Sequence, residues 1–414
     1  MIAGARLALC ALLLVASVTA QSQDIAVRGK MVYPVTGEPI QDGVVLVREG
    51  KIAAVGRADR VRIPNGVEVI DAAVVTPGLI DARSVVGLAG YLNQPDDQDQ
   101  IERSEAIQPE LRAIDAYNAR EALIGWLRSF GITTVHTGHA PGEVISGQTM
   151  IVKTTGDTVA DSVIVPLAMI AATLGEGAVV ENGNGRKSPG NRSKAVAMLR
   201  AELVKARGYA EKKGTENEGG DEEKEPPSRD LRLDALAAVL AGEIPLLITA
   251  HRHNDIMTAL RVQEEFGFRL VLDGAAEAHQ LLDVIKAADV PVLIHAPMAR
   301  AYGERENMSF TTPAKLAKEQ IPFAFQSGFE GYVPKTRVVL FEAAVAVQHG
   351  LPFERALAGL TIEAANILGI EDRVGSIEVG KDGDLALYDG DPFEYTSHAV
   401  GTIIDGVQVS KLER

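Results

Sequence analysis

The sequence predicts a distorted TIM-like (β/α)8 barrel with a small composite β-sandwich built from both chain ends. The central part of the 414-residue chain alternates short apolar runs with helical stretches. Both ends instead carry only short strand-like runs separated by turns. The length suits one large barrel together with a smaller attached unit.

The two chain ends have the pattern of short strands joined by glycine-containing turns. The strand-like runs cover residues 26–28, 44–47 and 52–55 at the first end, and 385–388, 401–404 and 407–409 at the last. We therefore expect residues 21–76 and 372–414 to build one β-sandwich together. Residues 77–371 are expected to form the barrel.

Short β-branched and apolar runs in the centre are typical of buried strands. They cover residues 132–135, 150–152, 246–248, 270–272, 292–294 and 323–325. Helical stretches such as 255–266 and 276–287 separate many of them, which favours a parallel sheet closed into a barrel. A further helix is expected at about 193–213, followed by an acidic, flexible surface insertion at about 214–229.

Residues 1–20 have the pattern of a secretory signal peptide. Arg6 precedes an apolar run from Leu7 to Val18 that is too short to cross a membrane, and small residues follow it. The single cysteine, Cys10, lies inside this run, so export would bring no disulfide. We expect a secreted or periplasmic protein without a membrane span after cleavage, with a retained N-terminal anchor as the alternative.

The composition narrows the classes of partner. A formal net charge of −15 argues against nucleic acid and against anionic membrane surfaces. The sequence has no Gly-x-Ser-x-Gly motif, which argues against a serine hydrolase of the α/β-hydrolase type. A small-molecule substrate or ligand is expected, and a homo-oligomer is left open.

Five histidines follow shortly after predicted strands of the barrel. They are His136, His139, His251, His253 and His295. The C-terminal ends of barrel strands meet at one mouth, where active sites lie. Imidazole is the commonest metal ligand, so a subset of these histidines could hold zinc or another divalent metal. The alternative for each one is a hydrogen bond to a loop carbonyl.

Lys153, Asp81 and Asp273 also end predicted strands. A lysine at a barrel mouth can be carboxylated and bridge two metals, and we include Lys153 among the candidate metal ligands. The alternative is an ordinary ion-paired lysine. The two aspartates could be ligands, bases or loop caps.

Both ends of the predicted barrel carry sequence that resembles the amidohydrolase superfamily. The matching stretches are residues 50–56, 76–81, 361–369 and 375–385. Gly147-Gln148 with Lys153, and His251 with Asp255, are similar to the imidazolonepropionase-like branch. The resemblance implies a barrel that binds one or two divalent metals, usually zinc. It also implies that a metal-bound water hydrolyses amide or related C–N bonds.

The positions of the family's usual metal ligands hold other residues in this chain. The two first-strand histidines correspond to Arg83 and Val85, and the fifth-strand ligand corresponds to Thr249. The sixth-strand histidine corresponds to Asp273, and the last-strand aspartate corresponds to Gly328. Neither a guanidinium nor a valine side chain binds a cation.

Two functions of different class follow from this pattern. The first is an exported hydrolase of C–N bonds with an atypical site, in which Asp273, His295 and Arg83 are the catalytic residues. Arg83 would then clamp a substrate carboxylate, because its planar fork matches that group. The second is an inactive pseudoenzyme that binds a small ligand or a protein partner and needs no metal.

Overall fold

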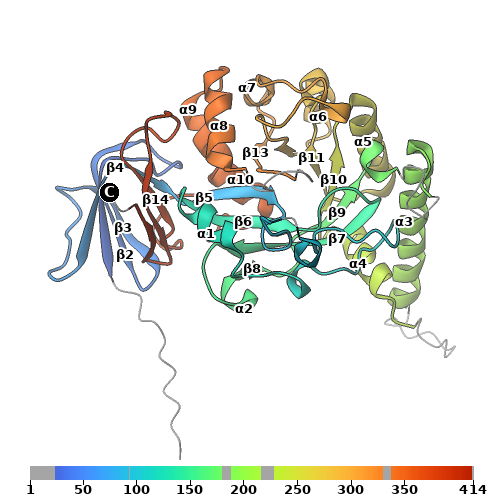
Figure 1. The fold of residues 1–414 in the computed structure, drawn as a ribbon, viewed down its shortest axis with the longest axis horizontal. Coiled ribbons are helices and arrows are strands. Elements are labelled where there is room, and N and C mark those ends of the chain that lie inside the picture. Colours follow the sequence, from blue (N-terminus) through green and yellow to red (C-terminus); the bar gives the residue numbers. More distant parts are fainter. Residues whose placement is uncertain (1–23, 93, 180–187, 216–227, 330–336, 413–414) are drawn as a thin grey trace, which may run out of the picture.

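The computed structural model describes residues 24–92, 94–179, 188–215, 228–329 and 337–412 (Figure 1). The predicted signal peptide lies outside the described residues, and so does most of the predicted acidic insertion. The helix expected before that insertion is present as α3 (Arg192–Thr215). Within the described part of the chain, no helix is both long and apolar enough to cross a membrane.

The two chain ends form one separate seven-stranded sheet, as the sequence predicts, and Figure 1 shows it in blue and red beside the barrel. Strand β4 joins the two ends, because it pairs in parallel with β1 and antiparallel with β14. The sheet runs in the order β16-β15-β14-β4-β1-β2-β3. Its strands are β1 (Ile25–Val32), β2 (Ile40–Arg48), β3 (Lys51–Arg57), β4 (Glu68–Pro77), β14 (Leu385–Tyr388), β15 (Ala399–Ile404) and β16 (Val407–Lys411).

The centre of the chain forms the predicted distorted barrel, whose strands run in the order β13-β12-β11-β10-β9-β7-β6-β5. The backbone N–H of Gly328 donates to the carbonyl of Arg83 at 3.0 Å and links the two edges at the mouth. The strands are β5 (Leu79–Ser84), β6 (Ile132–Gly138), β7 (Ile145–Lys153), β9 (Ile170–Thr173), β10 (Leu246–Ala250), β11 (Leu270–Gly274), β12 (Val292–Ile294) and β13 (Phe323–Phe325). A short strand, β8 (Val163–Val165), pairs only with β7.

Strand β7 distorts the barrel because it runs antiparallel to its neighbours. The expectation of an all-parallel sheet was therefore wrong. It pairs antiparallel with both β6 and β9. Only residues 139–144 connect β6 to β7. A parallel crossover needs about a dozen residues or more, so this short connection forces the chain to turn back. The C-terminal end of β7 therefore lies at the opposite end of the barrel from the mouth.

Helices cover the outside of the barrel, and α3 and α5 are the longest of those described. The others are α1 (Ala122–Arg128), α2 (Val159–Ser162), α4 (Leu231–Leu240), α6 (Leu282–Ala287), α7 (Thr312–Lys318), α8 (Val339–Gln348), α9 (Phe353–Gly359) and α10 (Ile362–Leu368), and α5 spans His253–Phe266. The predicted helix at 276–287 is shorter than expected, because a 3-10 turn at Ala278–Gln280 precedes α6.

The inside of the barrel is filled by one layer of apolar side chains. Leu247, Val271, Leu293 and Ala324 contribute from four consecutive strands, and all are buried. Side chains two residues apart on a strand face the same side. The residues that follow this layer by two positions are therefore expected to face the mouth, and they are polar.

Candidate functional site

A cavity of about 40 Å³ lies at the C-terminal mouth of the barrel. Its lining includes Thr249, Asp273, His295 and Gln326, each two residues beyond a member of the apolar layer. His251 and the loop residues Arg305 and Arg337 complete the polar part of the wall. A volume of this size holds a water molecule and one small chemical group rather than a whole drug-sized molecule.

Asp273 lies at the centre of this polar lining and is 3% exposed. Its Oδ1 accepts a hydrogen bond of 2.7 Å from Nε2 of Gln326, and its Oδ2 accepts one from the hydroxyl of Thr249. The amide of Gln326 also donates to the carbonyl of Leu293 at 2.7 Å, which fixes its orientation. A carboxylate oxygen has two lone pairs, so each oxygen of Asp273 can still accept a hydrogen bond from a molecule in the cavity.

Two histidines lie beside Asp273 in the same cavity. Burial lowers the pKa of His295 to about 3 and that of His251 to about 4, so both rings are neutral at neutral pH. Among the described residues, both ring nitrogens of His295 and Nδ1 of His251 have no hydrogen-bond partner. A neutral imidazole carries one donor and one acceptor, and these rings can therefore offer either to a bound molecule.

Asp81 and Arg83 lie on β5, at the seam where the barrel closes. Oδ1 of Asp81 accepts backbone N–H groups of Ser327 at 3.0 Å and of Arg83 at 3.3 Å. Burial raises the pKa of Asp81 to about 7, although these hydrogen bonds and the charge of Arg83 oppose the rise. Burial lowers the pKa of Arg83, opposed by the charges of Asp273 and Asp81.

Replacing Asp81 by asparagine is expected to stabilise the protein more at pH 8 than at pH 5. A carboxyl whose pKa rises from 3.8 to about 7 on folding binds more protons in the folded state within that window. Its contribution to stability is therefore lost as pH rises from about 4 to about 7. We expect the free energies of unfolding of variant and wild type to diverge by about 3 kcal/mol between pH 5 and pH 8. Urea unfolding at both pH values measures this, with the exposed Asp283→Asn as the control. An equal offset at both pH values would contradict the prediction.

The other predicted histidines do not join the cavity. His136 is fully buried, and its ring nitrogens contact the carbonyl of Ala82 and the hydroxyl of Thr149, both at 2.7 Å. His136 therefore makes a hydrogen bond to a backbone carbonyl, which was the expected alternative to metal binding. His139 is 5% exposed, and neither of its ring nitrogens has a hydrogen-bond partner within the part of the chain that the structure describes. Gly147 lies so close to the ring of His139 that a β-carbon there would approach Cδ2 to 2.5 Å.

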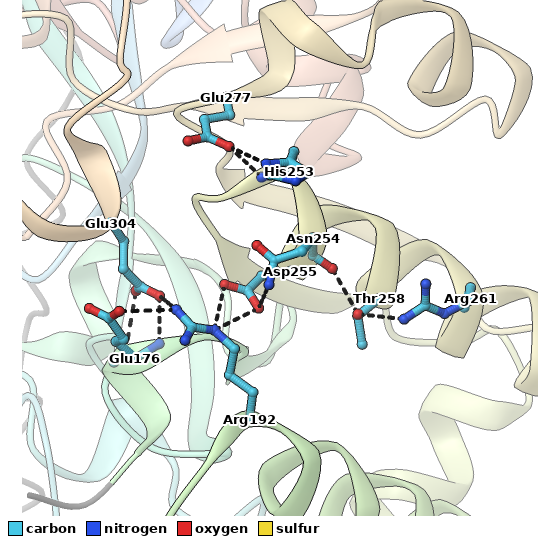
Figure 2. A network of polar contacts seen from close by, with 10 residues as sticks. Glu176, Arg192, His253, Asn254, Asp255, Thr258, Arg261, Glu277 and Glu304 are labelled. Atoms are coloured by element: carbon cyan, nitrogen blue, oxygen red, sulfur yellow. Dashed lines mark hydrogen bonds and ion pairs between the residues drawn. The ribbon is translucent and has the colours of Figure 1, made fainter.

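Lys153 lies away from the mouth, which corrects the expectation that it ends there, and His253 follows β10 without lining the cavity. Lys153 ends the antiparallel strand β7 and meets Asp382 and Asp384 of the chain-end sheet at 2.8 and 3.2 Å. His253 begins α5 and pairs through Nδ1 with Glu277 at 2.9 Å, and its side chain is 61% exposed (Figure 2). Neither side chain lines the cavity.

The donor set does not fit the metal centre that the family resemblance implies. Catalytic zinc needs about three protein ligands and an open position. In the described residues, no group of three or more His, Cys, Asp or Glu side chains is placed to hold a metal ion. Val85 instead packs in a small apolar cluster with Ala89 and Ala140, and Gly328 has no side chain to contribute.

A network of ion pairs around Arg192 includes Glu304, the residue before Arg305 of the cavity wall (Figure 2). Arg192, at the start of α3, contacts Asp255 at 3.1 Å, Glu176 at 3.2 Å and Glu304 at 3.1 Å. The pKa of Glu304 is raised by burial and by the nearby charge of Asp255, and burial also raises that of Asp255. Arg192 is therefore the cation that keeps several crowded carboxylates together.

Replacing Arg192 by methionine is expected to destabilise the protein by about 1–2 kcal/mol at pH 7.5. The loss should be smaller at pH 5.5, because protonation relieves repulsion between carboxylates whose pKa values are already raised. Thermal unfolding at both pH values measures it. Arg261→Met is the matched control, since Arg261 is exposed and its side chain donates to the hydroxyl of Thr258. A loss that is no larger than in this control would contradict the role given to Arg192.

The sequence did not point to Arg305 and Arg337 as lining residues. Arg305 ends a short 3-10 helix (Gly303–Arg305) and Arg337 lies just before α8, and no periodic pattern in these segments distinguishes one arginine from another. The sequence also did not point to Gln326 and Ser327, which line the cavity. The regular spacing from the apolar layer would have placed Gln326 at the mouth.

Comparison with known proteins finds amidohydrolases both by sequence and by structure. The family model described as Amidohydrolase family matches residues 335–410. The crystal structure of an amidohydrolase from Thermotoga maritima MSB8 is 30% identical, with a TM-score of 0.85, and the match covers 94% of this chain and 100% of that chain.

Two curated proteins are similar in sequence. Amidohydrolase tasK of Hapsidospora irregularis is 25% identical over 390 residues, which are 88% of this chain. An imidazolonepropionase of Mesorhizobium japonicum is 42% identical over 59 residues, which are 14% of this chain. The matches span only 39% and 14% of the length of these two proteins.

Proposed function

The chain belongs to the amidohydrolase superfamily, and from that premise we propose that it hydrolyses a carbon–nitrogen bond of a small molecule at the mouth of its barrel. One observation carries the proposal. Asp273 is held by Thr249 and Gln326 in a cavity that it shares with the neutral rings of His251 and His295. A carboxylate beside neutral imidazoles is a set of groups suited to moving a proton.

The reaction can be written with these groups alone. Asp273 takes a proton from a water molecule, whose oxygen attacks the carbonyl carbon. A ring N–H of His295 or His251 donates to the carbonyl oxygen as negative charge develops there. When the C–N bond breaks, Asp273 returns its proton to the leaving nitrogen. No step is routed through a metal, because the donor set does not fit one.

The size of the cavity limits how a substrate binds. A volume of about 40 Å³ accommodates a water molecule and the reacting group, so the remainder of the substrate lies outside it. Arg305 and Arg337 stand at the wall of this cavity and favour a substrate with negative charge. A carboxylate close to the scissile bond would suit their planar donor groups.

The proposal includes export, which rests on the leader-like pattern of residues 1–20 alone. Cell fractionation with an antibody to the chain tests it. Recovery in the medium or the periplasmic extract, with an N-terminus near Gln21, is the expected result. Recovery in the cytosol with residues 1–20 intact would contradict export.

Ligand binding without turnover is the second candidate function. Arg83 stands at a position where active family members carry a metal-binding histidine, and this favours a site that has lost hydrolysis. The expected behaviour is then tight binding of a small anion without any product. A compound that raises the melting temperature of the chain but gives no product in a hydrolysis assay would indicate binding without turnover.

The experiment is a hydrolysis screen with the full chain purified without a His-tag. Dipeptides, N-acyl amino acids and cyclic amides are supplied, and release of the amine is measured with and without a chelator. We expect turnover of at least one class, unchanged by the chelator and lost in Asp273→Asn. Turnover retained by Asp273→Asn would overturn the proposed mechanism, and binding without product would favour the second candidate.

A further inference from the structure

The loop between β12 and α7, residues 295–311, supplies much of the wall of the mouth cavity. Four of its residues line the cavity, namely His295, Ala296, Ala299 and Arg305. One short 3-10 helix, Gly303–Arg305, is the regular structure in this loop. A loop of this length holds one conformation only when contacts with other parts of the protein fix it.

Glu304 makes such contacts, although its own side chain does not line the cavity. The side chain is 12% exposed, and its two oxygens accept the backbone N–H groups of Glu176 and of Gly177, the latter at 3.4 Å. The guanidinium of Arg192 pairs with it at 3.1 Å (Figure 2). Two backbone amides and one cation from the segments around β9 and α3 therefore hold a carboxylate of the mouth loop.

The turn that receives this carboxylate has room for it because residue 175 is a glycine. Gly175 has a φ of 106°, which favours glycine. A β-carbon there would approach Oε1 of Glu304 to 2.3 Å and Oδ2 of Asp255 to 2.9 Å. A side chain at this position would thus fill the space of the carboxylate. Residues 175–177 form a backbone cradle for Glu304.

The seating of Glu304 fixes the residue that follows it. A 3-10 helix has about three residues per turn, so neighbouring side chains point about 120° apart. Glu304 points into the cradle, and Arg305 lines the cavity. The backbone N–H of Arg305 donates to the carbonyl of Tyr302 at 3.1 Å, and its guanidinium lies 5.3 Å from the centre of the Tyr302 ring.

We infer that Glu304 is a positioning residue, which sets Arg305 in the cavity wall and so gives the mouth its preference for small molecules with a carboxylate. The inference rests on the proposed function for the class of substrate. Glu304 acts through Arg305 and does not touch the reacting atoms. His295, at the start of the same loop, is held separately, because its backbone N–H donates to the carbonyl of Gly274 at 2.7 Å.

A double-mutant cycle in the full chain tests this role. Each N-acyl amino acid of the hydrolysis screen is compared with its carboxamide. We expect Glu304→Ala to raise KM for the acid about 10-fold, with kcat within about 2-fold of wild type and no effect on the carboxamide. Glu304→Gln keeps an acceptor for a backbone N–H and should restore part of the wild-type KM.

Arg305→Gln should raise KM for the acid to the same extent, and adding Glu304→Ala to it should raise KM no further. Two rises that multiply would overturn the inference, because Glu304 would then not act through Arg305. The matched control is Glu306→Ala in the same loop. Glu306 pairs with Arg252 at 3.3 Å, but its side chain is 53% exposed, so KM should stay unchanged.

Hydrogen exchange measured by mass spectrometry tests the seating of the loop without any turnover. Amides of residues 296–311 should exchange about 10-fold faster in Glu304→Ala than in wild type or in Glu306→Ala, while β10 and β11 keep their rates. If the wild-type chain hydrolyses nothing, the proposed hydrolysis fails, and the cycle is measured from dissociation constants of the same compounds. A loop that exchanges at the wild-type rate, or a wild-type chain that binds acid and carboxamide equally, would overturn the inference.

Discussion

Replacing Lys153 by methionine is expected to lower the free energy of unfolding by about 3–5 kcal/mol. The side chain of Lys153 is 5% exposed and lies where the barrel meets the sheet of the chain ends. It contacts Asp382 at 2.8 Å and Asp384 at 3.2 Å, and it also pairs with Asp405. Removing one partner of a buried ion pair leaves the other charges buried without compensation, which is the costly change.

The matched control is Lys51→Met. Lys51 also pairs with Asp382, but its side chain is 52% exposed. An exposed ion pair contributes about 0–1 kcal/mol, so this variant should unfold close to wild type. Urea unfolding of both variants measures the difference. If Lys153→Met lost no more stability than Lys51→Met, the ion pairs of Lys153 would not stabilise the contact between the sheet and the barrel.

Replacing Asp273 by asparagine is expected to lower kcat by about 10²–10⁴-fold on any substrate that the chain hydrolyses. An asparagine keeps the shape of the side chain and can accept from Gln326 while donating to Thr249. It cannot take a proton from water. The loss should therefore appear in kcat, with KM and the far-ultraviolet circular dichroism spectrum little changed.

Asp283→Asn makes the same chemical change on the exposed surface of α6 and should leave kcat unchanged. A wild-type kcat in Asp273→Asn would remove this carboxylate from the reaction. A rise in KM with unchanged kcat would give Asp273 a role in binding alone.

The sequence predicted the barrel strands well because their signals are local. Runs such as Leu246-Leu247-Ile248 and Val292-Leu293-Ile294 are apolar and short, and they lie in the structure as β10 and β12. The same regularity predicted that His251 and His295 would approach each other, and both line the cavity. Their roles in catalysis stay predictions.

The position of Lys153 could not be predicted in the same way. The direction of β7 depends on a short connection and on pairing with strands on both sides, which are properties of the folded barrel. The aspartates that pair with Lys153 lie more than 200 residues further along the chain. No local pattern links a lysine to partners at that separation.

The metal content of the purified full chain tests the central claim that the groups at the barrel mouth act without a bound metal. The chain is prepared without a His-tag, dialysed against zinc and then against buffer, and analysed by elemental mass spectrometry. We expect well below one equivalent of metal per chain, since the described residues offer no suitable group of ligands. About one equivalent of zinc, retained through dialysis and lost in His251→Ala, would contradict the account.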